Sequence, residues 1–301
     1  METTEKTAFE ETLALRVGEL NKALSAFLPE ETGMQKQLLS ACNYSVENGG
    51  KRLRPLFLSL CYRLCGGDSA HFAEDVLPFM AAIEMIHSSS LVHDDLPCMD
   101  NDRLRRGKPS TWAKFGEDMG TLAGDGLMIY AFETACKSKA PAERKLRAVQ
   151  ILAEKTGIFG MIGGQSVDVL LTGEKPNPEQ LRYIYENKTG ALLEASFMMG
   201  GVLAGASEET IGTLEHAASL IGLAFQIQDD ILDATQTAEV LGKSAGSDAR
   251  NEKTTWLTYY GMEASQREVS RCTEEAVRLL EEIGSETFLT ELCQFLIHRS
   301  H

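Results

Sequence analysis

Two short segments of the sequence concentrate aspartates beside apolar residues. In the first, DDLPCMD, Asp94 opens an adjacent pair that follows an apolar run, and Asp100 comes six residues later. In the second, DDILD, Asp229 and Asp233 are four residues apart and share one face of a helix, with Asp230 beside them. Like charges at that spacing destabilise a helix unless a cation binds. Because all these donors are oxygens, the segments predict a hard metal ion, with Mg²⁺ first.

The alternative for either segment alone is a solvated acidic surface. Each segment follows an apolar stretch and is expected to end its helix, where the macrodipole disfavours anions, so a bound cation explains both better. Pro97 should disturb the turn after the first pair and could bring Asp100 back toward Asp94. Cys98 lies in the same segment, but a soft thiol is a poor Mg²⁺ ligand, so we treat it as a bystander.

Basic residues stand in short motifs beside glycine and proline. Arginine binds phosphate through two parallel hydrogen bonds and lysine binds it as a point charge. Carboxylates for a metal together with separate cations suit a substrate that carries a diphosphate. The candidate cations are Lys51, Arg52 and Arg54 in GGKRLRP, Arg105 and Arg106 in RLRRGK, Lys188 in NKTG, Lys243 in LGKS and Lys253 in NEKT.

The elements that position these residues are expected to be helices. Residues 7–28, 72–93 and 209–233 place apolar side chains at every third or fourth position, the period of an amphipathic helix. No segment shows a convincing alternating strand pattern, and none resembles an interdomain linker. We therefore predict one all-α domain, residues 1–301, of roughly ten to thirteen helices. The polar, glycine-rich stretch 241–253 is a candidate mobile loop.

Composition excludes several classes of protein. The chain has 301 residues, a formal net charge of −15 and 43% hydrophobic residues, so a nucleic-acid binder, which needs a basic face, is disfavoured. No apolar run is long enough to span a membrane, and the acidic opening stretch is unlike a signal peptide. The seven scattered cysteines form no CxxC pair, which favours reduced thiols and a cytoplasmic protein.

In their order along the chain, these motifs resemble those of the all-trans polyprenyl diphosphate synthases, bacterial short-chain type, and farnesyl diphosphate synthases above all. The resemblance includes His87 seven residues before Asp94, and it extends from Gly49 to Lys253. It implies an isoprenoid-synthase bundle of helices around a central catalytic cavity, usually a homodimer. The matching motifs are GGKRLRP, the first aspartate motif with its two-residue insertion and following RR, the KT pair, FQ, DDILD and the GK…D…K loop.

The resemblance also implies a reaction, the Mg²⁺-dependent head-to-tail condensation of isopentenyl diphosphate with dimethylallyl or geranyl diphosphate. Three Mg²⁺ ions would be present with substrate bound, held by Asp94, Asp100 and Asp229. The neighbouring Asp95, Asp230 and Asp233 would support them. The allylic diphosphate would be bound by Arg105, Lys188 and Lys243. The isopentenyl diphosphate would be bound by Lys51, Arg54, His87 and Arg106, and Lys253 would also contact substrate. The allylic cation would be stabilised by Lys188, Thr189 and Gln226.

Two positions depart from the family pattern after the first motif. Where many relatives have an acid, this chain has Arg103, and Thr111–Trp112 replace a polar pair. The rim of the site is therefore expected to differ while its central cations remain. His87 taken alone would more simply be a hydrogen-bonded core histidine.

Product length depends on the residues one helical turn before Asp94, because one turn rises about 5.4 Å, close to one isoprene unit. Those residues are Ser89 and Ser90, and many bacterial farnesyl synthases carry an aromatic side chain at the position of Ser89. Small residues leave room for a twenty-carbon product, with Met85 and Ile86 closing the next turn. On resemblance, farnesyl diphosphate is the expected product and geranylgeranyl diphosphate the alternative.

Three other classes remain as alternatives. A class I terpene cyclase would carry a different second metal motif and no GGKRLRP segment. A non-catalytic partner subunit of a prenyl synthase would have lost one aspartate motif, and this chain has both. A helical scaffold protein would leave the acidic and basic clusters unexplained.

Overall fold

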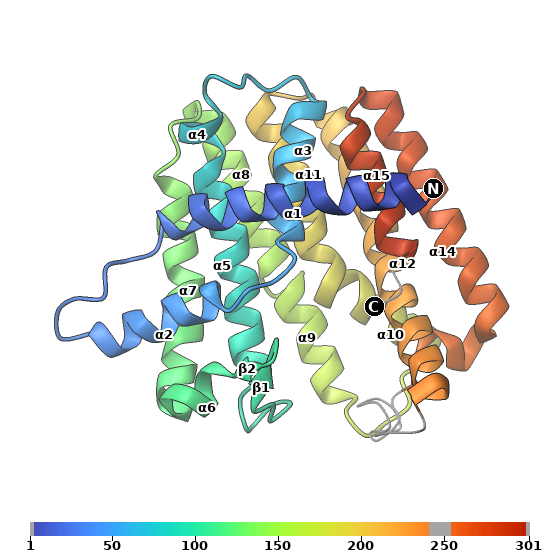
Figure 1. The fold of residues 1–301 in the computed structure, drawn as a ribbon, viewed down its shortest axis with the longest axis horizontal. Coiled ribbons are helices and arrows are strands. Elements are labelled where there is room, and N and C mark those ends of the chain that lie inside the picture. Colours follow the sequence, from blue (N-terminus) through green and yellow to red (C-terminus); the bar gives the residue numbers. More distant parts are fainter. Residues whose placement is uncertain (1–2, 241–253, 299–301) are drawn as a thin grey trace. The chain divides into compact units, whose positions relative to one another are not determined.

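The computed structural model describes residues 3–240 and 254–298, and nearly all of its regular structure is helical (Figure 1). The predicted all-α class is confirmed. Fourteen α-helices occur in the described residues, more than the ten to thirteen expected, because the count includes the short helices α4 and α6. The helices are α1 (Thr3–Ser25), α2 (Lys36–Glu47), α3 (Leu53–Leu64), α4 (Phe72–Asp75), α5 (Leu77–Asp94), α6 (Thr111–Phe115), α7 (Glu117–Cys136), α8 (Ala142–Thr156), α9 (Met161–Leu170), α10 (Pro178–Ile184), α11 (Ala191–Ala204), α12 (Glu208–Val240), α14 (Trp256–Ile283) and α15 (Thr287–His298), with a π-helix, η1, at Tyr185–Gly190.

The chain forms two compact units. One comprises Met1–Ser59 and Asp68–Val149, and the other comprises Leu60–Gly67 and Gln150–His301. The prediction of one domain over residues 1–301 stays a prediction.

In the first unit, helix α5 forms the centre of the core. Pro78 occupies its first turn, where the missing N–H costs nothing, and most of its residues are buried on all sides. Helix α7 runs alongside it (Figure 1). Small residues on α7 permit a close approach, since a Cβ added at Gly124 would lie 2.1 Å from Nε2 of His93 on α5. This packing fixes the C-terminal end of α5, where the first aspartate pair lies.

In the second unit, α11, α12 and α14 pack together. Helix α11 is apolar and buried over almost its whole length, as its sequence ALLEASFMMGGVLA predicts for a core helix. Helix α12 also approaches η1, where a Cβ added at Gly222 would lie 3.0 Å from Cα of Gly190. The second aspartate motif and the KT motif are thereby carried on neighbouring elements of one core.

Two differences from the sequence prediction concern element boundaries. Residues 72–93 form two helices, α4 and α5, which separate at Val76. The segment RLRRGKP forms a small antiparallel hairpin of β1 (Leu104–Arg105) and β2 (Lys108–Pro109), which the search for alternating patterns missed because each strand is only two residues long.

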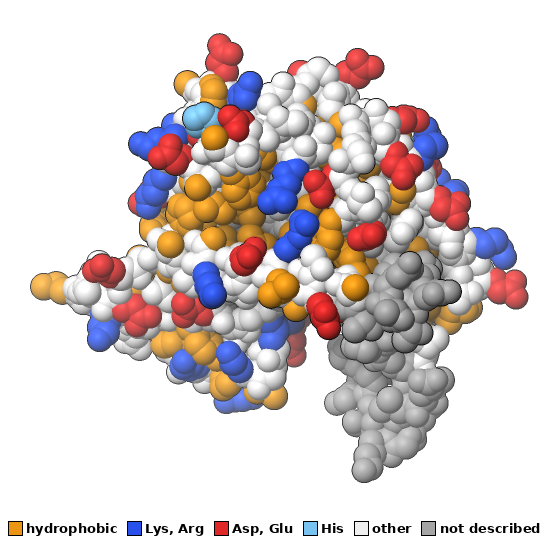
Figure 2. All heavy atoms as spheres, turned by 45° about the horizontal axis from the view of Figure 1, so that its top comes forward, with side chains coloured by type: hydrophobic (Ala, Val, Ile, Leu, Met, Phe, Trp, Pro, Cys, Tyr) orange, Lys and Arg blue, Asp and Glu red, His pale blue; other side chains and the backbone are white. Residues whose placement is uncertain are grey.

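No helix in the described part of the chain is long and apolar enough to cross a membrane. All seven cysteines are free thiols, in agreement with the prediction from their spacing. On the face drawn in Figure 2, acidic and basic side chains are interspersed, and no continuous basic surface of the kind that binds nucleic acid is visible there.

Candidate functional site

The first aspartate motif lies at the end of α5 and folds back on itself. Asp94 is the last residue of the helix and is half-buried, whereas Asp100 is exposed. The amide of Asp100 donates a hydrogen bond of 2.9 Å to the carbonyl of Asp94. The prediction that the turn around Pro97 returns Asp100 toward Asp94 is confirmed.

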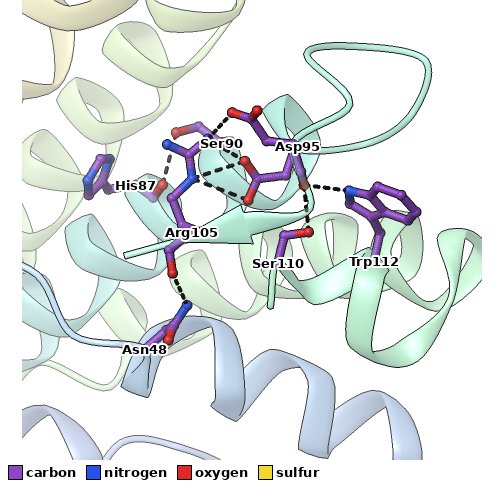
Figure 3. A network of polar contacts seen from close by, with 8 residues as sticks. Asn48, His87, Ser90, Asp95, Arg105, Ser110 and Trp112 are labelled. Atoms are coloured by element: carbon purple, nitrogen blue, oxygen red, sulfur yellow. Dashed lines mark hydrogen bonds and ion pairs between the residues drawn. The ribbon is translucent and has the colours of Figure 1, made fainter. Parts of the chain in front are cut away.

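The middle aspartate of this motif is bound by an arginine of the hairpin. Asp95 is only 2% exposed, and Nε of Arg105 donates to its Oδ1 at 3.0 Å while Nη2 contacts the same carboxylate (Figure 3). The Asp95 carboxylate raises the pKa of Arg105 above its usual range, so the guanidinium stays charged. This pair leaves the Asp95 carboxylate occupied by protein donors.

The hairpin that presents Arg105 turns through two left-handed residues. Leu104 pairs with Pro109 and Arg105 pairs with Lys108, so the turn contains only Arg106 and Gly107. Their φ angles are 54° and 76°, as a two-residue type I′ turn requires. Glycine tolerates this region and arginine does not, so the turn holds Arg106 in a strained conformation.

The segment before α3 supports the hairpin. Asn48 donates to the carbonyl of Arg105 at 3.2 Å, and Nη1 of Arg106 donates to the carbonyl of Gly49. Gly50 has a φ of 125°, and a Cβ there would lie 2.6 Å from Cζ of Arg106. The glycine pair of GGKRLRP therefore makes room for the Arg106 guanidinium.

Backbone strain in the described residues is concentrated in these segments. Arg52, Asn101 and Arg106 are the three non-glycine residues there with a positive φ, between 50° and 55°. Each such residue costs on the order of 1–3 kcal/mol, and strain of this kind gathers at functional sites. Arg52 and Arg106 belong to motifs that the sequence singled out for their charge, and Asn101 directly follows the first aspartate motif.

The arginines of GGKRLRP have different environments. Arg52 is 5% exposed and its guanidinium donates to Glu84 at 2.6 Å, to the carbonyl of Val46 at 2.5 Å and to Asn21 at 2.8 Å. Nε of Arg54 is buried and has no hydrogen-bond partner among the described residues. Arg52 therefore stabilises the fold, whereas Nε of Arg54 is one of several buried side-chain atoms without a hydrogen-bond partner in the described residues.

Burial lowers the pKa of Arg54 to about 10, although Glu84 opposes this. Burial likewise lowers the pKa of His87 well below its usual range, and the nearby positive charge of Arg54 and Arg106 lowers it further. His87 is therefore neutral at physiological pH, with one ring nitrogen able to donate and the other able to accept. Lys51, the other residue predicted in this cluster, is exposed.

The second aspartate motif lies within α12, not at its end. The prediction that DDILD ends its helix is wrong, because α12 continues to Val240. The unfavourable macrodipole at a helix C-terminus therefore applies to the first motif only. Asp229 is half-buried and Asp233 is exposed.

The middle aspartate of this motif is also bound by protein donors. Oδ2 of Asp230 accepts hydrogen bonds from the Tyr185 hydroxyl at 2.6 Å and from the backbone N–H of Trp256 at 2.9 Å. Asp95 and Asp230 thus correspond, since each is held by the fold. The ligand set Asp94, Asp100 and Asp229 stays a prediction.

Lys188 and Thr189 lie in the π-helix η1, which interrupts an otherwise continuous helix. Nζ of Lys188 lies 2.5 Å from Oδ2 of Asp168 on α9. A Cβ at Gly164, also on α9, would lie 2.2 Å from the amide nitrogen of Lys188, so this close contact requires glycine. Short π-helical segments occur frequently at functional sites. Gln226, predicted beside these residues, is half-buried on α12.

Sequence reasoning missed Asp168 and Tyr185. Neither belongs to a charged cluster, since Asp168 is 20 residues from Lys188 and Tyr185 is 45 residues from Asp230. The one available signal for Asp168 was an isolated acid in the apolar segment MIGGQSVDVL of α9.

The residues predicted to set product length face in different directions. Ser89 is fully buried, and its hydroxyl donates to the carbonyl of Gly124 on α7 at 2.9 Å. Ser90 is half-buried, and its hydroxyl donates to the carbonyl of His87 on its own helix at 2.9 Å. Met85 and Ile86 are buried one turn earlier. Helix α7 therefore lies directly against Ser89.

Two predicted cations, Lys243 and Lys253, and the whole candidate loop 241–253 lie outside the described residues. Within residues 3–240 and 254–298, no three side chains of His, Cys, Asp or Glu form a group that could hold a metal ion by themselves. Mg²⁺ is commonly bound by one or two carboxylates together with phosphate oxygens and water, and the oxygen donors of both motifs fit that chemistry.

Comparisons with known proteins agree on one family. A family model described as Polyprenyl synthetase matches residues 35–287. The chain is 39% identical over 293 residues to the farnesyl diphosphate synthase of Bacillus subtilis (strain 168), covering 96% of this chain and 97% of that protein. It is 40% identical over 268 residues to the geranylgeranyl diphosphate synthase of Cyanophora paradoxa, covering 88% of each.

A solved structure has the same architecture. The apo FPP/GFPP synthase from Zymomonas mobilis matches with a TM-score of 0.84 at 30% sequence identity, covering 97% of this chain and 99% of that one. The fold and the family resemblance drawn from the motifs are thus found by independent comparisons.

Proposed function

Because the chain belongs to the polyprenyl synthetase family and is a prenyltransferase, we propose that it condenses isopentenyl diphosphate head-to-tail with allylic diphosphates to form farnesyl diphosphate. The near full-length similarity to a farnesyl diphosphate synthase supports this product. Geranylgeranyl diphosphate is the alternative, because a relative of that name is equally similar and because Ser89 and Ser90 are small.

One observation carries the proposal, the buried Nε of Arg54 that has no partner in the described residues. A buried donor left unpaired costs roughly 1–3 kcal/mol, so its retention points to a ligand that supplies the acceptor. Neutral His87 and the guanidinium of Arg106 lie near enough to interact with it electrostatically. The diphosphate of isopentenyl diphosphate would supply acceptor oxygens and compensating charge together.

The allylic diphosphate would be bound by Arg105 and Lys188. Arg105 already contacts the carboxylates of Asp95 and Asp102, and Lys188 contacts that of Asp168, so both cations are oriented before substrate arrives. Asp94, Asp100 and Asp229 would hold Mg²⁺, which supplies positive charge to neutralise the leaving diphosphate. Preorganised cations of this kind stabilise the charge that develops as the carbon–oxygen bond breaks.

The hydroxyl of Thr189 and the amide oxygen of Gln226 would face the allylic cation. Both groups carry partial negative charge and are poor nucleophiles, so they stabilise a carbocation without capturing it. Both residues are half-buried, which limits the water that could quench the cation.

Two properties of the whole protein belong to the same proposal. The exposed apolar side chains of Leu122 and Ile129 on α7, 51% and 71% exposed, support a homodimer. Seven free cysteines support a cytoplasmic protein, because reduced thiols persist in that compartment.

The test is the chain length of the product. Purified protein is incubated with Mg²⁺, isopentenyl diphosphate and each allylic primer in turn, and the dephosphorylated products are separated by chromatography. Farnesol is the expected end product, and geranylgeraniol would favour the alternative. No product with any primer would refute the proposed activity and favour a non-catalytic partner subunit.

A further inference from the structure

The carbonyl of Asp102 accepts two side-chain hydrogen bonds. The hydroxyl of Ser110 donates to it at 2.7 Å and the indole Nε1 of Trp112 donates at 2.8 Å (Figure 3). A carbonyl oxygen has two lone pairs, so these donors use its full capacity. The backbone that leads into the hairpin is therefore held from one side by residues that follow the hairpin.

Ser110 makes this contact in place of the capping hydrogen bond that is usual for a serine at its position. It occupies the N-cap position of α6, with extended backbone angles of −64° and 164°, but its side chain makes no capping hydrogen bond. A capping serine typically contributes about 1 kcal/mol to its helix. The diversion of its hydroxyl to Asp102 indicates that the position of this carbonyl matters more than the cap of a five-residue helix.

Arg103 and Trp112, two of the three residues at which the sequence departs from the family pattern, contact each other. The Arg103 guanidinium lies 5.1 Å from the centroid of the Trp112 ring, a cation–π contact. The amide of Ser110 also donates to the carbonyl of Arg103 at 2.9 Å. These contacts close the base of the hairpin, and they explain why an arginine and a tryptophan occur together here.

Fixing Asp102 also fixes Arg105. The carboxylate of Asp102 lies 3.4 Å from Nη2 of Arg105, and the same guanidinium forms an ion pair with Asp95. We propose that Trp112 is a positioning residue for Arg105, acting through the carbonyl of Asp102 with Ser110 as its partner. This inference rests on the proposed function, because it assigns Arg105 to the allylic diphosphate.

The experiment is a double-mutant cycle with Trp112→Phe, Ser110→Ala and both together. Trp112→Phe keeps an aromatic ring beside Arg103 and removes only the N–H. Either donor can still hold the carbonyl alone, so we expect each single variant to raise the KM for geranyl diphosphate by about fivefold or less. The double variant should exceed the product of the two single effects, since it leaves the carbonyl without a donor. The KM for isopentenyl diphosphate should change less than twofold, because Arg106 is anchored separately to Gly49.

A matched control exists on α7. The Tyr130 hydroxyl donates to the carbonyl of Phe27 at 3.1 Å and its ring lies 4.7 Å from Nζ of Lys137, so Tyr130→Phe removes an aromatic donor beside a cation–π contact away from the hairpin. It should leave both KM values unchanged. Arg103→Gln, at an exposed position, removes only the cation–π contact and should raise the KM for geranyl diphosphate by about twofold even if the Trp112 variants fold poorly.

Equal rises in both KM values, effects of Ser110→Ala and Trp112→Phe that simply multiply, or the same kinetic change in Tyr130→Phe would each overturn the inference. Calorimetric binding of inorganic diphosphate with Mg²⁺ separates it from the proposed function. If the wild type forms no prenyl product but binds diphosphate, and the double variant binds diphosphate more weakly, only the proposed function is overturned. Diphosphate binding equal in the wild type and the double variant would overturn the positioning role.

Discussion

Replacing Arg54 by methionine should make the unliganded protein more stable. Burial lowers the pKa of Arg54 to about 10, more than two pH units below that of a free guanidinium. One pH unit corresponds to about 1.4 kcal/mol, so at any pH below about 10 the buried charge lowers the free energy of unfolding by about 3 kcal/mol. This destabilisation disappears only above the pKa of Arg54 in the unfolded chain. Methionine of similar length carries no charge and needs no partner, so Arg54→Met should recover up to about 3 kcal/mol.

The assay is thermal unfolding followed by circular dichroism, with and without inorganic diphosphate and Mg²⁺. For a chain of this size a gain of 1 kcal/mol raises Tm by roughly 2 °C or more, so a rise of about 6 °C is expected. Diphosphate should raise the Tm of the wild type by mass action and raise that of the variant less, because only the site that contains Arg54 is impaired.

Arg52→Met is the matched control, two residues away. It breaks a guanidinium with three partners and removes the donor that is hydrogen-bonded to the buried Glu84, so it should destabilise the protein by about 3–5 kcal/mol. If Arg54→Met lowers Tm as Arg52→Met does, the argument that Arg54 is held for a ligand at a cost to stability is wrong.

Three further predictions concern His87, Asp168 and Ser89. Burial depresses the pKa of His87, so below about pH 6.5 the unfolded chain takes up a proton that the folded chain does not, and the free energy of unfolding falls by up to about 1.4 kcal/mol per pH unit. His87→Gln should reduce that fall, measured by urea unfolding at pH 5 and at pH 7. An unchanged pH dependence in the variant would contradict this prediction. Asp168→Asn weakens the contact that orients Lys188 and should raise the KM for geranyl diphosphate on the order of tenfold, so unaltered steady-state kinetics would refute that role. Ser89→Tyr should shorten any product longer than fifteen carbons and, by overpacking the contact with Gly124, lower stability by about 1–3 kcal/mol, and an unchanged yield of products longer than fifteen carbons would rule out residue 89 as a floor.

The parts of the site that sequence could predict are those encoded by local chemistry. Helical periodicity gave the fold class, and Pro97 gave the turn that joins Asp100 to Asp94, because proline restricts its neighbours wherever it occurs. The end of α12 was misplaced because the apolar periodicity stops at residue 233, whereas the helix continues to Val240.

Other parts depend on contacts between distant residues. The turn at Arg106 lacks the Asn-Gly or Asp-Gly pair that marks a type I′ hairpin, and Asn48 and Gly49 stabilise it from outside. The pairs formed by Asp168 with Lys188 and by Tyr185 with Asp230 join residues that are 20 and 45 positions apart, so no local pattern shows which residues pair. The sequence therefore indicated which charged residues belong to the candidate site, but it could not predict which side chains form hydrogen bonds or ion pairs with them.

The π-helix at Tyr185–Gly190 has a consequence for how this motif can change over time. A π-turn contains one residue more than an α-turn, so the continuous run of α10, η1 and α11 carries a surplus residue at the KT motif. Successive side chains of an α-helix point about 100° apart around the helix axis. The extra residue therefore rotates the side chains of α11, relative to those of α10, from the directions that an uninterrupted α-helix would give them. A point substitution changes no residue count and cannot remove that rotation, whereas a single deletion or insertion can. The direction in which Lys188 projects is thus buffered against substitution and exposed to changes in chain length.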